Sequence, residues 1–181
     1  MMTRLTQLTI LCSLLLFIAS ACSKPGPNSS SDSATTPASS PTAQRITSES
    51  VVKAEAQAVT ISAGGSGEAI VRLTIQSGYH VNANPPTYPY LKATTLDISA
   101  DDGVSVATVT YPKALEKKFP FADKPLKVYE GATEVKATLK VDRAVQKGER
   151  SLPARLRIQA CDNQVCYPPG TLELAIPVNI K

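Results

Sequence analysis

Two cysteines lie close together in the segment 159–169, Gln-Ala-Cys-Asp-Asn-Gln-Val-Cys-Tyr-Pro-Pro. Four residues separate Cys161 from Cys166, so a disulfide between them would close a very small ring. The loop-entropy estimate for a ring of about six residues is roughly 2 kcal/mol, against about 4 kcal/mol for a long loop. A bond that adds so little stability suits a reversible redox centre. The pair therefore predicts thiol–disulfide exchange, and a structural clip across a hairpin stays open as the alternative.

The residues around this pair predict how the bond is placed. The segment 162–165 contains Asp and Asn, which favour a turn, so Cys166 is expected on a strand beside that of Cys161. Opposed residues of an antiparallel pair have Cα atoms about 4.5 Å apart, within disulfide range. Alternation that points Leu156 and Ala160 inward puts Cys161 on the outer face, where a partner thiolate could reach it.

A metal site at this pair is a weaker interpretation. A metal would need more ligands than two thiols, and His80 is the one imidazole of the chain. We therefore expect no metal and no other cofactor. A metal-delivery role for the two thiols is the third option, after exchange and a structural clip.

The N-terminus has the layout of a secretory signal. Arg4 precedes an apolar run over 8–18, which is too short to span a bilayer of roughly 20 residues' depth. Ala-Ser-Ala then leads directly to Cys22, which resembles a bacterial lipoprotein processing site. We expect 1–21 to be a lipoprotein signal peptide and Cys22 to be lipidated, with several acyl chains giving a stable membrane anchor. Ordinary cleavage near Ala21 with a free Cys22 is the alternative.

This N-terminus accounts for the four cysteines and predicts the compartment. Cys12 would leave with the signal and Cys22 would carry lipid, so Cys161 and Cys166 remain as a pair in an oxidising compartment. The expected location is the periplasm, with a lipid anchor in the bacterial envelope. Ser23 is not an acidic retention signal, which favours the outer membrane over the inner one.

The rest of the chain divides into a linker and one domain. Residues 22–45 are rich in Ser, Pro, Thr and Ala and cannot bury enough surface to fold, so they predict a flexible coil spanning on the order of 25–30 Å. Residues 46–181 have the size of one domain. The formal net charge is +4, and basic residues do not cluster among aromatics, so nucleic acid is not an expected partner.

Hydrophobic alternation of period two predicts strands, and no window has a helical period. The clearest strands are 68–76, 133–142, 152–158 and 171–180; shorter candidates are 57–62, 94–99, 104–111 and 126–129. The apolar parity switches between Val106 and Val109, as a bulge requires, and Pro177 indicates an edge or bulged position. Seven to nine short strands with Gly and Asp turns predict an all-β fold, an immunoglobulin-like antiparallel β-sandwich.

Several short segments carry a family resemblance. They are Gly78-Tyr79-His80-Val81-Asn82-Ala83-Asn84, Phe119-Pro120-Phe121, Val128-Tyr129-Glu130-Gly131, Ala160-Cys161 and Cys166-Tyr167-Pro168-Pro169. In this order they resemble the N-terminal periplasmic domain of the thiol:disulfide interchange protein DsbD, over about residues 50–181. That family has an immunoglobulin-like fold with a redox cysteine pair near one end. It receives electrons from a thioredoxin-like domain fed by a membrane transporter, and passes them to periplasmic thiol proteins.

The resemblance implies roles for individual residues. Cys166 would form mixed disulfides with partners, and Cys161 would be the resolving thiol. A cap loop over 119–123 would shield the cysteines with an aromatic side chain, either Phe119 or Phe121, of which Phe121 is favoured. Ordinary core packing is the alternative for both phenylalanines.

Four further residues are expected beside the cysteines: Tyr79, His80, Asn82 and Tyr167. A histidine there could help to hold a thiolate, and the tyrosine after the second cysteine could pack over the disulfide. A polar strand end that caps a turn is the plainer interpretation of 79–82.

The sequence also departs from the family. Four residues separate the cysteines, where the best-known member has five, and the chain contains no transmembrane channel or thioredoxin-like domain. We therefore expect a stand-alone protein-disulfide reductase module that relays electrons from a thioredoxin-like or membrane reductant to oxidised envelope proteins. The alternative is a non-catalytic envelope binding or assembly module with a structural disulfide.

Overall fold

The computed structural model of the chain describes residues 45–99 and 102–181. The expected signal peptide 1–21 and Cys22 lie outside these residues, as does all of the expected linker except Arg45. The described residues belong to a compact unit, Ala43–Lys181. The boundaries predicted from the sequence stay predictions.

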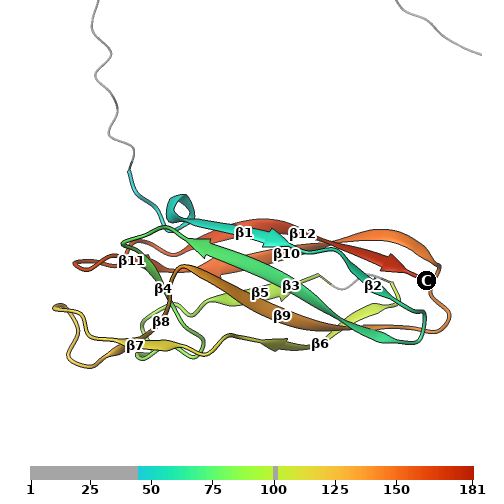
Figure 1. Cartoon of the computed structure of the whole chain (residues 1–181), viewed down its shortest axis with the longest axis horizontal. Helices are drawn as coiled ribbons and strands as arrows, with labels where there is room; N and C mark the ends of the chain where they lie inside the picture. Colours follow the sequence, from blue (N-terminus) through green and yellow to red (C-terminus); the bar gives the residue numbers. More distant parts are fainter. Residues whose placement is uncertain (1–44, 100–101) are drawn as a thin grey trace, which may run out of the picture. The chain divides into compact units, whose positions relative to one another are not determined.

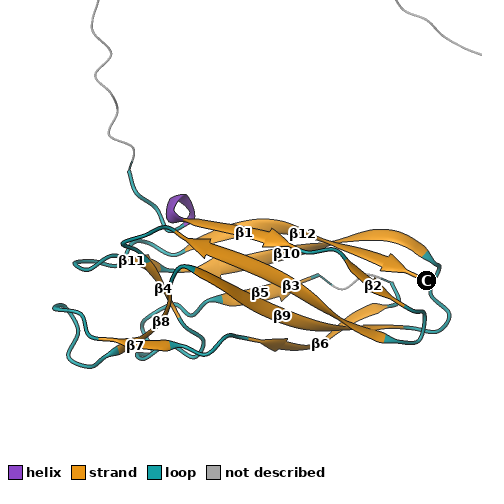
Figure 2. Cartoon of the chain, in the orientation of Figure 1, coloured by secondary structure: helices purple, strands orange, loops and turns teal. Residues whose placement is uncertain are grey.

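The described part of the chain contains twelve strands and one 3-10 turn (Figure 2). In chain order they are η1 Glu49–Val51, β1 Val52–Ala56, β2 Val59–Ile61, β3 Ser66–Ile75, β4 His80–Asn82, β5 Thr95–Ile98, β6 Val104–Thr110, β7 Leu115–Lys117, β8 Leu126–Tyr129, β9 Ala132–Val141, β10 Gly148–Ile158, β11 Ala160–Cys161 and β12 Gly170–Ile180.

The strands form two main sheets and one small sheet (Figure 1). The main sheets have the orders β1-β3-β9-β6 and β2-β12-β10-β5, and the small sheet at one end of the domain has the order β11-β4-β8-β7. All strand pairs are antiparallel except β2 with β12. The domain is an immunoglobulin-like antiparallel β-sandwich, which confirms the predicted fold class.

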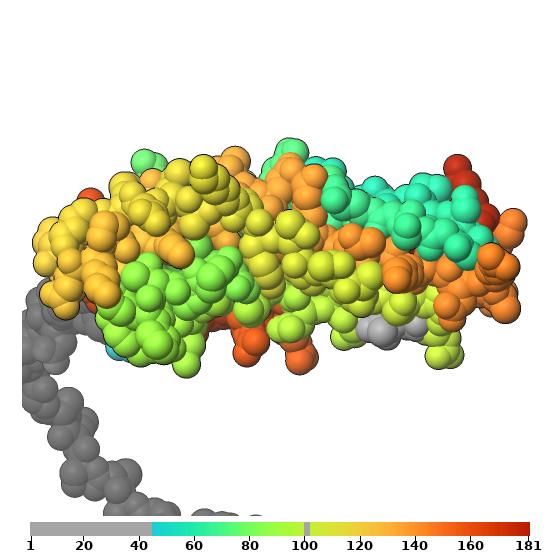
Figure 3. Space-filling model, turned by 90° about the horizontal axis from the view of Figure 1, so that it is seen from below, coloured from blue at the N-terminus to red at the C-terminus, as the bar shows by residue number. Residues whose placement is uncertain are grey.

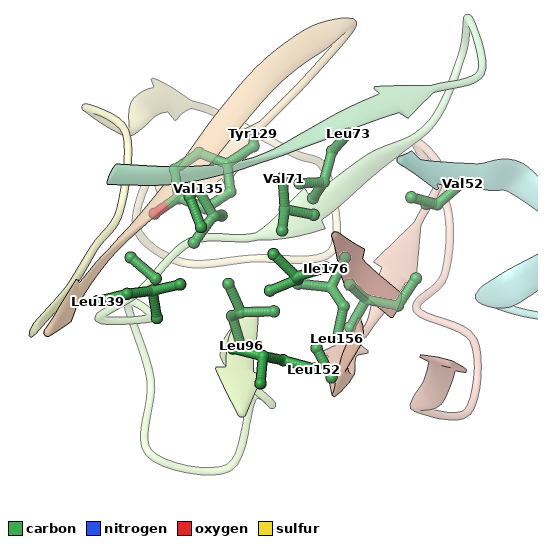
Figure 4. Close-up of a cluster of buried hydrophobic side chains, with 14 of the residues drawn as sticks. Val52, Val71, Leu73, Leu96, Tyr129, Val135, Leu139, Leu152, Leu156 and Ile176 are labelled. Carbon is green, nitrogen blue, oxygen red and sulfur yellow. The ribbon is translucent and has the colours of Figure 1, made fainter. Parts of the chain in front are cut away.

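The core lies between the two main sheets (Figure 4). Alternate residues of the long strands point inward, because successive side chains of a strand face opposite ways. Leu73 of β3, Leu139 of β9, Leu156 of β10 and Ile176 of β12 are fully buried. Each such side chain stabilises the fold by about 1.5–3 kcal/mol. The two main sheets, packed on this core, form the framework to which the small sheet is attached.

Hydrophobic alternation identified the long strands correctly. The position of the bulge, the pairing of Pro177 and the short strands depend on how the strands pair. The bulge expected between Val106 and Val109 is confirmed, because the β6–β9 register shifts between Val106 and Thr108. Pro177 is in β12 between β10 and β2, but the β2 register begins only at Val178, so proline is paired on the β10 side alone. The short strands β1, β4, β7 and β11 were not predicted, so the expected count of seven to nine was too low.

Candidate functional site

Cys161 and Cys166 form a disulfide at the end of the domain that carries the small sheet. They face each other as an antiparallel bridge, as expected from the spacing, and their Cα atoms are 3.9 Å apart, closer than the expected separation of about 4.5 Å. Backbone hydrogen bonds lie on either side of them: Asp162 N donates to Val165 O at 3.0 Å, and Tyr167 N donates to Ala160 O at 2.8 Å. The cysteine loop, residues 161–166, is therefore a tight hairpin closed by the disulfide.

Cys161 is fully buried, so the expectation that it lies on the outer face was wrong. That expectation assumed that the strand 152–160 runs on regularly. Instead, β10 ends at Ile158, and after Gln159 the chain joins a different sheet as β11, which pairs with β4. The parity of β10 is lost at this transfer, and Ala160 and Cys161 are both buried.

Cys166 is only half-buried and borders a cavity of about 310 Å³. The residues that line this cavity with Cys166 are Tyr88, Tyr90, Leu91, Phe121, Ala122, Leu126 and Gln159. Tyr88 and Tyr90 stack with ring centroids 5.2 Å apart, and Tyr90 is 71% exposed. In Figure 3 the surface around residues 115–125, in yellow, adjoins the green surface around 85–92 at this end of the domain. The second cysteine thus lies beside a cavity lined in part by aromatic side chains.

The two phenylalanines of the cap loop, 119–123, have different surroundings. Phe119 is buried with Leu126 and Val128, whereas Phe121 is 42% exposed and lines the cavity of Cys166. Their rings stack at 5.4 Å. Lys118 Nζ donates to the carbonyls of Ala122 at 3.0 Å and Asp123 at 2.5 Å, which closes the loop on itself.

His80 lies directly across the strand pair from Cys161. Its ring stacks on Phe119 with centroids 4.2 Å apart, it is 1% exposed, and its Nε2 has no hydrogen-bond partner among the described residues. Burial lowers the pKa of His80 from 6.5 to about 4, against the opposing charges of Glu130 and Asp162. The imidazole is therefore neutral at pH 7, and it is not at an exposed turn.

Asn82 is also fully buried, and it connects the small sheet to Gln159. Its Nδ2 donates to Gln159 Oε1 at 3.1 Å, and the same oxygen accepts from Lys92 N at 2.9 Å. Gln159 Nε2 donates to the carbonyl of Tyr167 at 3.3 Å. Gln159, which the sequence did not indicate as a site residue, therefore connects Asn82 of β4 and Lys92 to Tyr167, directly after the second cysteine.

Tyr79 and Tyr167 lie together beside the cysteine loop, with ring centroids 6.1 Å apart. The Tyr167 hydroxyl donates to Asp162 Oδ2 at 2.6 Å. This bond raises the pKa of Tyr167 to about 12 and lowers the pKa of Asp162. The structure thus brings Tyr79, His80 and Tyr167 around the cysteine loop, with Asn82 one step further away through Gln159.

Ser48, which the sequence did not indicate, supports the base of the loop. Its Oγ accepts from Ala160 N at 2.9 Å and donates to Pro168 O at 2.6 Å, and the residue is fully buried. A serine in a serine-rich segment gives no signal of such a contact.

Tyr88 and Tyr90, which line the cavity of Cys166, could have been found from the sequence. Aromatic residues in a proline-rich segment without strand alternation are poor candidates for the core, so they are candidates for a site.

Neither a metal site nor a membrane helix is found within residues 45–99 and 102–181. No three His, Cys, Asp or Glu side chains there are grouped to hold a metal ion. No helix in that part of the chain is long and apolar enough to cross a membrane.

Solved structures similar to this domain include the N-terminal domains of two proteins. The N-terminal periplasmic domain of ScsB from Proteus mirabilis is 18% identical, with a TM-score of 0.48, and covers 69% of this chain. This chain spans 44% of that structure's length. The reduced N-terminal domain of DsbD from Neisseria meningitidis is 21% identical, with a TM-score of 0.44, and the match covers 72% of this chain and 87% of that one.

The sequence itself gives the assignment. No match is found among curated proteins. The family profile described as thiol:disulfide interchange protein DsbD, N-terminal, matches residues 47–176, which include both cysteines, the cap loop and every strand except the end of β12. The chain therefore belongs to the family of the N-terminal domain of the thiol:disulfide interchange protein DsbD.

Proposed function

We propose that the chain is an extracytoplasmic thiol–disulfide exchange module that uses Cys161 and Cys166 as its redox pair. The observation that carries this proposal is that the two cysteines differ in their exposure to solvent. Cys161 is fully buried, whereas Cys166 is half-buried beside a cavity. A partner can approach Cys166 while Cys161 waits behind it, which is the arrangement that an attacking thiol and a resolving thiol require.

The exchange consists of two half-reactions, and Cys166 forms the mixed disulfide with the partner in both. A thiolate of a thioredoxin-like donor attacks Cys166 Sγ, and Cys161 leaves as a thiolate that takes up a proton. The second donor thiolate then displaces Cys166, so the donor becomes a disulfide and the pair becomes a dithiol. Toward a client, Cys166 attacks the client disulfide and releases one client thiolate. Cys161 then attacks Cys166 Sγ, which restores the disulfide and releases the second client thiol.

The proposed setting is the periplasm. Lipidation of Cys22 would hold the module at the envelope membrane, preferably the outer one, and the linker would let it reach a separate donor and separate clients. Proteins with oxidised cysteines would be its substrates, and it would act as a protein-disulfide reductase without a metal or another cofactor. Support comes from the DsbD N-terminal family match and from the secretory pattern of the first 22 residues.

One observation favours a second candidate, a binding module with a structural disulfide. A fully buried Cys161 is what a structural cross-link would also have. In that case the cysteines would shape the loop, and the domain surface would bind another envelope protein without chemistry.

Trapping of a mixed disulfide tests the proposal. Full-length Cys161→Ala and Cys166→Ala variants are reduced and then mixed with glutathione disulfide, and peptide mapping by mass spectrometry assigns the modified cysteine, because Cys12 and Cys22 are also present. We expect Cys161→Ala to accumulate glutathione on Cys166, and Cys166→Ala to accumulate little on the buried Cys161. Equal trapping would remove the assignment of roles. A folded Cys161→Ala that does not react at Cys166 would support the structural disulfide instead.

A further inference from the structure

Three hydrogen bonds converge on the carboxylate of Asp162. Oδ1 accepts from Gln164 N at 2.7 Å and from Val165 N at 2.9 Å, and Oδ2 accepts from the Tyr167 hydroxyl at 2.6 Å. Asp162 directly follows Cys161, and Tyr167 directly follows Cys166. The Asp162–Tyr167 pair therefore joins the two arms of the cysteine loop through side chains that are not part of the disulfide.

The bond between Asp162 and Tyr167 belongs to the strong class. An O–H donor to a carboxylate at 2.5–2.7 Å is charge-assisted and is about twice as strong as a neutral hydrogen bond. The shifts of both groups agree with this: Tyr167 is the largest cause that lowers the pKa of Asp162, and Asp162 is the largest cause that raises that of Tyr167. At neutral pH the carboxylate is ionised and the phenol keeps its proton, so the bond is formed.

Other contacts hold the same hairpin on the opposite side of the disulfide. Ser48 Oγ bridges Ala160 N and Pro168 O, and Tyr167 N donates to Ala160 O. Non-covalent bonds thus lie both before and after the cysteine pair. None of these contacts involves a sulfur atom.

We propose that Asp162 and Tyr167 are positioning residues that set the equilibrium between the Cys161–Cys166 disulfide and the dithiol, an inference that rests on the proposed exchange function. With the pair in place, the two thiols stay opposed after reduction, which gives each a high effective concentration at the other. Without the pair, the reduced loop gains conformational freedom that the oxidised loop, closed by its disulfide, cannot gain. Loss of the pair therefore favours the dithiol.

The redox equilibrium with glutathione measures this effect. Two glutathione thiols reduce the protein disulfide and become glutathione disulfide, so the ratio of dithiol to disulfide follows from alkylation and peptide mapping of 161–166. In full-length Asp162→Asn and Tyr167→Phe, we expect the equilibrium constant to move about three- to tenfold toward the dithiol. For a two-electron couple this makes the potential less negative by about 14–30 mV.

Two comparisons show whether the effect belongs to the pair. The double variant is expected to shift no further than the larger single one, because both changes remove the same bond. Asp97→Asn is the matched control, since it removes an exposed carboxylate of β5 whose partner is Arg157 at 3.5 Å, and it should not move the potential. Tyr167→Phe keeps the ring, so it remains usable if Asp162→Asn does not fold.

Titration of Tyr167 provides the second readout. The chain has six tyrosines, so the phenolate absorbance of Tyr167 is taken as the difference between a protein and its Tyr167→Phe counterpart. This difference should titrate with a pKa of about 12 in the wild-type background and with a lower pKa in the Asp162→Asn background. Unchanged potentials in folded Asp162→Asn and Tyr167→Phe, or an equal shift in Asp97→Asn, would overturn the assignment. The potential of the wild type tests the proposed exchange function separately: a value below about −300 mV is that of a structural disulfide, whereas the difference between variant and wild type tests the Asp162–Tyr167 pair.

Discussion

The residue that distinguishes this site electrostatically is His80. An imidazole buried across from a cysteine, with one nitrogen unpartnered, lacks the hydrogen bonds with which water would compensate its charge. Burial is the largest cause of its lowered pKa, and Lys117 adds to the effect, while Glu130 and Asp162 oppose it. In the oxidised state His80 is therefore a neutral group beside the disulfide, and a resting imidazolium is not present to attract a thiolate.

The lowered pKa of His80 predicts how stability depends on pH. Between pH 6.5 and about 4 the unfolded state binds a proton on His80 that the folded state does not bind, so stability falls as pH falls through this window. A shift from 6.5 to about 4 corresponds to on the order of 3 kcal/mol. Urea unfolding at several pH values should show this loss in the wild type and a smaller one in His80→Asn. Since the chain has one histidine, an identical loss in both proteins would contradict the prediction.

At the scale of elements, the small sheet and the cap loop surround the cysteines. β4 and β8 hold His80 and the packing partners of Phe119, and the cap loop extends from β7 toward the cavity of Cys166. Phe119 belongs to the small core, while Phe121 forms part of the cavity wall. We therefore expect the two aromatic residues of this short loop to have separable roles, Phe119 in stability and Phe121 in shielding Cys166.

Substitution of each phenylalanine separates these roles. We expect Phe121→Ala to speed the reduction of the disulfide by dithiothreitol with little loss of stability, because it opens the wall beside Cys166. Phe119→Ala should instead destabilise the domain by about 3–5 kcal/mol, the usual cost of removing a buried aromatic ring. Leu115→Ala, at an exposed position of β7, is the control. If Phe121→Ala and Leu115→Ala are reduced at the wild-type rate, the cap loop does not shield Cys166.

At the scale of the whole domain, the Cys161–Cys166 disulfide is separate from the main core. The two large sheets bury their residues between each other, and the cysteine loop lies at the end where the small sheet is attached (Figure 1). A small ring constrains little of the unfolded chain. We therefore expect the sandwich to stay folded when the disulfide is reduced, with a small loss of stability.

Reduction of the protein checks this independence. We expect dithiol and disulfide forms to have the same β-sheet circular dichroism, and the free energy of unfolding in urea to fall by about 2 kcal/mol on reduction. The expected value follows from a ring of about six residues. Global unfolding of the reduced domain would show that the disulfide is structural, and would favour the binding-module alternative.

The sequence by itself determined the elements whose cause is local. Period-two alternation identified β3, β9, β10 and β12, because each strand must point every second residue toward the core. The short spacing of Cys161 and Cys166 around a turn was enough to predict an opposed, bonded pair. The resemblance to the family likewise rested on short segments in order, and the profile match over residues 47–176 confirms it.

Only the tertiary structure decided what surrounds that pair. Local alternation placed Cys161 outside, but the transfer of the chain from β10 to β11 buried it, and the pairing with β4 put His80 opposite. Ser48 reaches Ala160 across 112 residues of sequence, and Tyr88 and Tyr90 meet Cys166 only in the folded cavity. Such contacts depend on how distant elements pack, which a period of two residues does not encode. The Cys161–Cys166 disulfide thus follows from local sequence. Its burial, its neighbouring side chains and its accessibility to a partner are determined by the tertiary fold.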